Sequence, residues 1–219
     1  MRIISGEFRG RVLKAPKGQD TRPTTDRVRE ALMSAVASAR GGFEGAVVLD
    51  AFAGSGALGF EALSRGAASV HFFERDGAAL RVVEDNARVL GLPATRARMQ
   101  RKDVLKTPPV QVRPAFDLVF LDPPYACEAD VVLGMVEELS RAGALASKVL
   151  IVYEHAAASR EDVDRVAKTC GLSLASRKKY GDTVVDILRG AAPGCEAPDL
   201  SPETHAGDAG EEKERNRPQ

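Results

Sequence analysis

The tetrapeptide Asp122-Pro123-Pro124-Tyr125 contains the residues whose types and spacing best fit a chemical step. An exocyclic amine of a nucleobase is a poor nucleophile, because its lone pair is delocalised into the ring. Two fixed hydrogen-bond acceptors, the Asp122 carboxylate and the Pro123 carbonyl, would favour the pyramidal amine that can attack a sulfonium methyl group. The prolines fix φ and hold these acceptors in place. Tyr125 can stack on the base, a contact worth about 1–3 kcal/mol. All four residues are therefore candidate catalytic residues.

A glycine-rich turn is the second candidate site. An apolar run ending at Asp50 leads into Gly54 and Gly56, and a helical pattern follows. Without Cβ atoms the chain can turn tightly and a ligand can approach the backbone, while the helix start offers free N–H groups and the positive end of a dipole. The next apolar run ends at Glu74, whose carboxylate can accept hydrogen bonds from both hydroxyls of a ribose. These features predict a nucleotide-type ligand at the carboxyl edge of a strand.

Two cofactor classes fit this turn. A dinucleotide would place its pyrophosphate at the helix start, whereas S-adenosylmethionine would place its methionine end there, with Asp50 near the ammonium group. A dehydrogenase has no use for the Asp-Pro-Pro-Tyr element, so the sequence favours S-adenosylmethionine. Asp103 is placed to bind the adenine amino group. The predicted cofactor site comprises Asp50, Phe52, Ala53, Gly54, Ser55, Gly56, Glu74, Arg75, Asp103 and Val104.

The elements that must position these residues alternate between strands and helices. Short runs rich in Val, Ile and Phe predict strands at 46–51, 69–74, 95–101, 116–122, 148–154, 172–179 and 183–188. Helical periodicity is expected after Gly56 and over 77–90, 129–140 and 160–169. This alternation is typical of an α/β fold, here a doubly wound sandwich with a seven-stranded, mostly parallel sheet. The last two runs form a hairpin that adds an antiparallel last strand.

An N-terminal extension precedes the sheet. Residues 2–5 and 10–13 flank a turn and predict a small β-ribbon, and a helix is expected from Thr25 or Asp26 to about residue 38. The segment 1–40 carries a net charge of +5, against −1 for 41–190 and −4 for 191–219. A basic extension on a near-neutral body suggests contact with a polyanion.

Composition limits the classes of protein to which the chain can belong. With 44% hydrophobic and 28% charged residues among 219, the chain is an ordinary globular protein. It has neither an apolar run of membrane-spanning length nor a signal-peptide core, so a cytoplasmic location is expected. Three separated cysteines and three scattered histidines have no ligand spacing, and we predict no metal. Residues 191–219 are rich in Pro, Gly and Glu and predict a disordered acidic tail.

The chain resembles a known family, the bacterial methyltransferases that modify the exocyclic N2 amine of a guanine in 16S ribosomal RNA, the small-subunit type D group. The resemblance extends over residues 1 to about 190. It rests on the motifs at 2–6 with 9–11, at 22–32, at 49–66, at 122–125 and at 180–183. It implies a class I, Rossmann-like, S-adenosylmethionine-dependent fold. Met33 departs from the family, which usually has an aromatic residue there.

The resemblance also implies a substrate and a role for each of three segments of the chain. Residues 1–40 would form a basic RNA-binding extension, 41–190 the methyltransferase domain and 191–219 the tail. The expected partner is 16S ribosomal RNA, within a small ribosomal subunit or an assembly intermediate, with no membrane partner and a monomeric protein. The expected RNA contacts are Arg9, Arg11, Arg22, Thr24 and Arg27.

Two other functions remain open at this point. An N6-adenine methyltransferase acting on DNA or RNA would use the same Asp-Pro-Pro-Tyr element, although the chain is short and has no separate target-recognition domain. A catalytically inactive RNA-binding or ribosome-assembly protein could keep the same fold. The intact acidic residues Asp50, Glu74 and Asp122 argue against an inactive protein.

Overall fold

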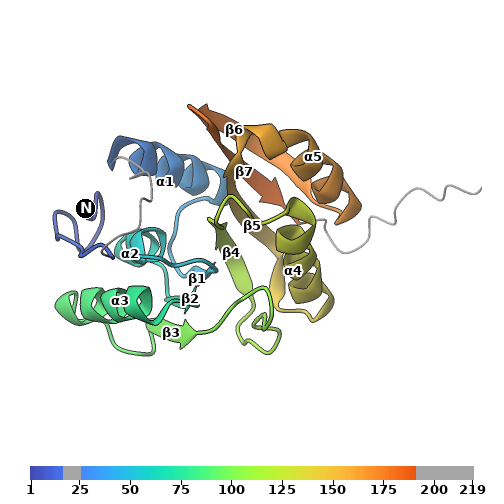
Figure 1. Ribbon diagram of the computed structural model, residues 1–219. Coiled ribbons are helices and arrows are strands. Elements are labelled where there is room, and N and C mark those ends of the chain that lie inside the picture. Colours follow the sequence, from blue (N-terminus) through green and yellow to red (C-terminus); the bar gives the residue numbers. More distant parts are fainter. Residues whose placement is uncertain (17–25, 191–219) are drawn as a thin grey trace, which may run out of the picture.

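A computed structural model describes residues 1–16 and 26–190 of the chain. Its centre is a seven-stranded sheet with the strand order β3-β2-β1-β4-β5-β7-β6 (Figure 1). The strands are β1 (Val47–Asp50), β2 (Ser69–Glu74), β3 (Ala97–Arg101), β4 (Phe116–Leu121), β5 (Leu145–Ala156), β6 (Ser173–Tyr180) and β7 (Thr183–Arg189). The helices are α1 (Asp26–Arg40), α2 (Ala57–Ser64), α3 (Gly77–Val89), α4 (Ala129–Arg141), the 3-10 turn η1 (Ala157–Ser159) and α5 (Arg160–Thr169).

The sheet confirms the predicted α/β architecture. All neighbouring pairs from β3 through β5 are parallel, and β7 runs antiparallel to both β5 and β6. The predicted strands and helices are all present. The largest difference is β5, which begins at Leu145 because the pairing with β4 shifts register between Phe116 and Leu118.

Side-chain alternation along the strands divides the core into two layers. On β4, Leu118 and Phe120 pack beneath α1, α2 and α3, whereas Val119 and Leu121 pack against α4 and α5. Figure 1 shows the same division, with α1–α3 on one side of the sheet and α4 and α5 on the other. Because successive strand residues point to opposite faces, the apolar runs must be continuous to fill both layers.

The N-terminal segment docks on α2 and forms the small β-ribbon that the sequence predicts, with an antiparallel bridge between Arg2 and Val12 and backbone hydrogen bonds that join residues 1–3 to residues 10–13. The buried Glu61 carboxylate accepts hydrogen bonds from the backbone N–H groups of Ile4 and Ser5, at 2.9 and 3.1 Å. Ser64 accepts from Phe8 and donates to the Ser5 carbonyl. Side chains of α2 thus pair backbone N–H groups that the ribbon itself leaves unpaired.

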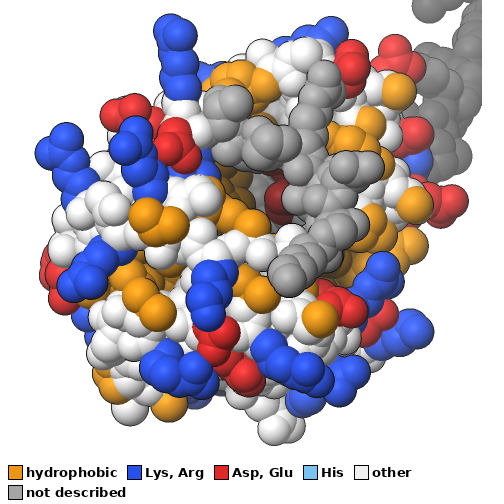
Figure 2. Space-filling model, turned by 60° about the vertical axis from the view of Figure 1, so that its left-hand side comes forward, with side chains coloured by type: hydrophobic (Ala, Val, Ile, Leu, Met, Phe, Trp, Pro, Cys, Tyr) orange, Lys and Arg blue, Asp and Glu red, His pale blue; other side chains and the backbone are white. Residues whose placement is uncertain are grey.

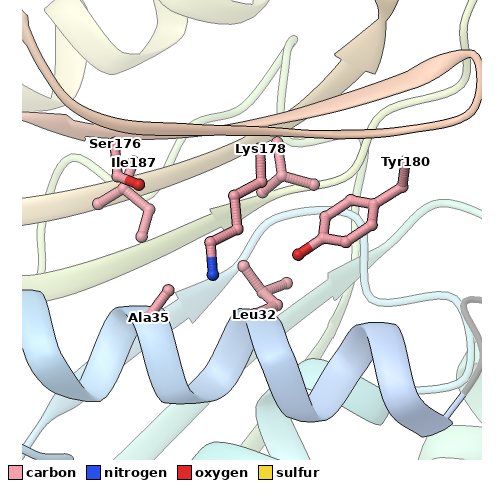
Figure 3. A pocket seen from close by; sticks show the side chains of 7 residues that line it. Leu32, Ala35, Ser176, Lys178, Tyr180 and Ile187 are labelled. Atoms are coloured by element: carbon pink, nitrogen blue, oxygen red, sulfur yellow. The ribbon is translucent and has the colours of Figure 1, made fainter.

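Helix α1 covers the outer strands β6 and β7. Figure 3 shows Lys178 and Tyr180 of β6 pointing toward α1, where Leu32 and Ala35 face them across a small gap. Met33 is fully buried on this helix and packs in the core layer that α1, α2 and α3 cover.

A buried ionic network links the strands at the β6 edge of the sheet to one another and to α5. Arg177 donates to both carboxylate oxygens of Asp186, at 2.6 Å each, and also pairs with Asp164 of α5. His155 of β5 contacts the same Asp186 at 3.1 Å. The network joins β5, β6, β7 and α5. Within residues 1–16 and 26–190, none of the helices is both long and apolar enough to cross a membrane.

Two helical glycines give a matched test of this packing. A Cβ on Gly59 would lie 2.3 Å from a ring carbon of Phe72 and 2.9 Å from Asp50 Oδ2, whereas a Cβ on Gly134 meets nothing within 4 Å. We expect Gly59→Ala to lower the free energy of unfolding by about 1–3 kcal/mol through overpacking. Gly134→Ala should raise it by about 0.5–1 kcal/mol, since Ala is the better helix former. Urea unfolding measures both, and equal stabilities would contradict the packing described.

Candidate active site

The site lies where the strand order reverses. Strand β1 has β2 on one side and β4 on the other, so the connections leave β1 and β4 in opposite directions and open a crevice at their carboxyl ends. Four acidic residues reach this edge from four adjacent strands: Asp50, Glu74, Asp122 and Glu154. By alternation all four lie on the sheet face that α1–α3 cover.

The glycine turn after β1 has the backbone that its sequence predicts. Gly54 and Gly56 adopt φ of 54° and 78°, values that favour glycine. Gly56 caps α2 without a side-chain hydrogen bond, so N–H groups of the first helical turn face the crevice edge. Phe52 and Ser55 are half-buried and Ala53 is buried. The Ser55 carbonyl accepts from Asn86 of α3, which fixes the turn against that helix.

Asp50 is buried beneath the turn. Its Oδ2 accepts a hydrogen bond from the Gly59 backbone N–H at 3.1 Å. Burial is the main cause that raises the pKa of Asp50 to about 7; the hydrogen bond from Gly59 opposes this shift, and the nearby charges of Asp122 and Glu74 contribute to it. A positive charge in the crevice would therefore interact favourably with an ionised Asp50.

Glu74 ties the glycine turn to β2. Its Oε2 accepts from Gly54 N–H at 2.9 Å and its Oε1 from Asp76 N–H at 2.8 Å. The carboxylate thus holds the loop in place and retains lone pairs for further donors. Arg75, next in the chain, is exposed.

Asp103 and Val104 follow β3 at the same edge. Asp103 is half-buried and acts as a turn acceptor for the Leu105 N–H at 3.1 Å, while Val104 is buried in the α4–α5 layer. Their place beside Glu74 is compatible with the sequence-based prediction that they line the far end of the cofactor site, which stays a prediction.

The Asp-Pro-Pro-Tyr turn follows β4 on the other side of Asp50. Asp122 is exposed at the surface, yet the dense protein around its carboxyl removes enough water to raise its pKa to about 6. Pro124 accepts a hydrogen bond from Cys127 N–H at 2.9 Å. In the described part of the chain no donor contacts the Pro123 carbonyl or the Asp122 carboxylate. Within these residues, both groups therefore remain acceptors without a donor.

Tyr125 is held by a residue that the site prediction missed. Its Oη lies 2.7 Å from Oγ1 of Thr183, the first residue of β7, while 59% of the tyrosine surface remains exposed. The hydrogen bond fixes the hydroxyl and leaves the ring free to stack. Thr183 closes the motif at 180–183, which the sequence singles out without assigning it a role.

Glu154 is the second residue that the site prediction missed. Leu121 of β4 pairs with Tyr153 of β5, so the next residues, Asp122 and Glu154, lie level with each other. Burial and, to a smaller extent, the charge of Asp122 together raise the pKa of Glu154 to about 7. The available signal was an acidic residue at the carboxyl end of a predicted strand, the same signal that identified Glu74.

The predicted RNA contacts divide into two groups. Arg9, Arg11 and Arg27 are exposed, and no carboxylate among the described residues pairs with them. Arg22 and Thr24 lie outside the described residues, as does the predicted tail at 191–219. Figure 2 shows Lys and Arg side chains spread over the face that carries the N-terminal segment, around a recess in which acidic side chains are visible.

Other cations of the extension have structural roles. Arg29 is 3% exposed and binds the Arg2 carbonyl and Asp26. Lys14 pairs with Asp85 on α3. In the described ranges no three His, Cys, Asp or Glu side chains gather as a metal site.

Comparison with known proteins identifies a family. The family model described as conserved hypothetical protein 95 matches residues 1–189. A curated relative, "Putative rRNA methyltransferase YlbH" of Bacillus subtilis, is 35% identical over 192 residues, which cover 86% of this chain and 98% of that protein. "Ribosomal RNA small subunit methyltransferase D" of Escherichia coli K12 is 39% identical over 158 residues, covering 70% of this chain and 74% of that one.

Solved structures agree with this match. A putative methyltransferase, yhhF from Escherichia coli, superposes with a TM-score of 0.70 at 33% identity, covering 88% of this chain and 98% of that one. The putative methylase HI0767 from Haemophilus influenzae gives a TM-score of 0.66 at 30% identity, covering 87% and 98%. The arrangement of strands and helices is therefore shared along nearly the whole described chain.

The raised pKa of Asp50 predicts a pH-dependent stability. Its folded pKa of about 7 exceeds its value of 3.8 in the unfolded chain, so its stabilising contribution is present at low pH and is lost as the pH rises through 7. Asp50→Asn removes this titration. Between pH 5 and pH 8 the variant should gain about 2–3 kcal/mol of unfolding free energy relative to the wild type.

The matched control is Asp76→Asn at the exposed cap of α3. The backbone N–H groups of Ala79 and Ala78 lower the pKa of Asp76, so it is ionised throughout this range. Its stability relative to the wild type should not change between pH 5 and pH 8. A flat difference for Asp50→Asn as well, measured by urea unfolding, would contradict the electrostatics of the site.

Proposed function

The chain belongs to the family described as conserved hypothetical protein 95, and from this premise we propose that it transfers the methyl group of S-adenosylmethionine to the exocyclic N2 amine of a guanine in small-subunit ribosomal RNA. One observation carries the proposal. The sheet edge brings the open acceptors of Asp122 and Pro123 beside a glycine turn lined with carboxylates. An amine that must be activated and a cationic methyl donor would meet there.

The chemistry of the crevice fits this cofactor. S-adenosylmethionine supplies an electrophilic methyl group on a positively charged sulfur, and it carries an ammonium group as well. Glu74 lies against Gly54 of the glycine turn and Asp50 against Gly59 at the start of α2, so two carboxyl groups can face a cationic ligand there. In our proposal the turn from Phe52 to Gly56 and Asp50 hold the methionine end. Glu74 and Arg75 lie at the ribose, and Asp103 and Val104 at the adenine.

The Asp-Pro-Pro-Tyr turn activates the amine in this proposal. Asp122 and the Pro123 carbonyl each accept one N–H of the guanine amine, which keeps its lone pair directed at the methyl group. The nitrogen would form a bond to the methyl carbon as the bond from that carbon to the sulfonium sulfur breaks, which leaves a neutral thioether. The nitrogen then loses a proton, which the ionised Asp122 can take and release to solvent. Tyr125, fixed through Thr183, stacks on the base after it leaves its helix.

The basic N-terminal segment would hold the RNA. Arg9, Arg11 and Arg27 present exposed charge for phosphates, and we expect Arg22 and Thr24 to reach the RNA near the active site. Because Glu61 and Ser64 anchor this segment to α2, the RNA contacts keep a fixed position relative to the glycine turn. We propose that the protein acts as a monomer on the small subunit or on an assembly intermediate.

The test is transfer of a deuterated methyl group. Small ribosomal subunits from cells that lack this gene are incubated with the protein and methyl-deuterated S-adenosylmethionine, and the digested RNA is mapped by mass spectrometry. We expect one labelled nucleotide, N2-methylguanosine. Label in N6-methyladenosine, in DNA alone, or in no nucleotide would refute the proposal.

Asp122→Asn tests the mechanism in the same assay. The variant should lose about 100-fold or more in kcat while still binding the cofactor, since proton acceptance contributes rate and not cofactor affinity. The wild-type rate should rise with pH through about 6, where Asp122 ionises. Asp162→Asn, on the exposed face of α5, is the control and should keep wild-type activity.

A further inference from the structure

We propose that Glu154 accepts a hydrogen bond from the N1–H of the target base and thereby selects guanine over purines whose N1 has no hydrogen. This inference rests on the proposed function and deepens it, because the Asp-Pro-Pro-Tyr turn by itself fits any exocyclic amine of a base. Glu154 would be a second contact to the base edge, adjacent to the amine.

The strand register places Glu154 for this contact. It lies level with Asp122 because Leu121 pairs with Tyr153 in the parallel β4–β5 ladder. On the other side it pairs with Val185 of β7, whose side chain belongs to the layer beneath α1–α3. Glu154 therefore shares the face of the sheet on which Asp122, Asp50 and Glu74 lie.

The hydrogen bonding of the four carboxylates separates them into two pairs. Asp50 and Glu74 are engaged by backbone N–H groups of Gly59, Gly54 and Asp76. Across residues 1–16 and 26–190 no donor engages Asp122 or Glu154. The first pair holds the protein's own loop, and the second pair is open to donors of a ligand.

Two adjacent open carboxylates repel each other, which is reflected in the raised pKa of Glu154, caused by burial and by the charge of Asp122. A ligand that presents two neighbouring N–H donors would satisfy both carboxylates and relieve this repulsion. Guanine presents such an edge, with N1–H beside the N2 amine. Adenine presents one amine donor beside a bare N1, whose lone pair would face the Glu154 carboxylate.

The analogue 2-aminopurine isolates this contact. It keeps the 2-amine that receives the methyl group but has a bare N1. A site built to hydrogen-bond a donor discriminates strongly against an analogue that lacks it, since its polar group is then left unpaired. We expect the wild-type protein to prefer guanosine by about 100-fold or more in kcat/KM.

The experiment compares two small subunits, reconstituted with guanosine or with 2-aminopurine riboside at the nucleotide mapped in the methylation assay. The rates are measured at pH 8 for the wild type, Glu154→Gln and Thr183→Val. The Gln amide can donate to a bare N1, so Glu154→Gln should lower the guanosine preference at least about 10-fold. Thr183→Val removes the support of Tyr125, which stacks on either base, and should slow both reactions without changing their ratio.

The outcomes separate the two proposals. If the wild type methylates neither subunit, the proposed function fails. If it methylates guanosine and Glu154→Gln leaves the preference unchanged, the role of Glu154 is refuted and the proposed function stands. Should Glu154→Gln fail to fold by circular dichroism, Glu154→Asp replaces it. The shorter acid cannot reach N1–H, so its preference for guanosine should fall, and an undiminished preference would overturn the inference.

Discussion

The repulsion among four carboxylates at one sheet edge is the constraint on which the rest of this structure depends. Asp50, Glu74, Asp122 and Glu154 lie at or near the carboxyl ends of neighbouring strands and share one face of the sheet. Burial raises the pKa values of Asp50, Asp122 and Glu154 to between about 6 and about 7, and repulsion by neighbouring carboxylates contributes to the shifts of Asp50 and Glu154. Groups with raised pKa values lower the stability of the folded protein as the pH approaches neutrality. In our account, a cationic cofactor and the N–H donors of a base offset this cost.

The surrounding fold keeps these groups together despite their repulsion. Parallel pairing sets Asp122 level with Glu154, and the backbone donors of the glycine turn engage Asp50 and Glu74. The N-terminal segment is fastened to the same turn region through Glu61 on α2, the helix that begins at the glycine turn. In our proposal, recognition of RNA and binding of the cofactor are thereby built on one rigid helix.

The sequence was sufficient for the features that depend on local pattern. Apolar runs and glycines located the strands, the turn after Asp50 and the Asp-Pro-Pro-Tyr element at one edge. It was insufficient where partners come from distant parts of the chain. The small β-ribbon forms as predicted, but its attachment to α2 depends on Glu61, more than fifty residues away, which accepts hydrogen bonds from Ile4 and Ser5. The net charge of the extension counts Arg29 with its other cations, yet Arg29 is buried beside Asp26.

Glu154 and Thr183 show the same limit at the candidate site. Each belongs to a strand that the sequence predicts, but their relevance depends on register and on a contact across 58 residues between Tyr125 and Thr183. Periodicity gives the face on which a residue lies and leaves open which strand becomes its neighbour. Only the strand order brings β5 and β7 beside the Asp-Pro-Pro-Tyr turn.

The central claim is that this carboxylate edge receives the positively charged cofactor, and proton release on binding tests it most directly. Isothermal titration of the protein with S-adenosylmethionine at pH 6.5, in buffers of different ionisation enthalpy, counts the protons exchanged. Asp50, with a pKa of about 7, is partly protonated at this pH and should ionise when positive charge arrives. The account predicts binding with net proton release. Absence of binding, or binding with proton uptake, would contradict it.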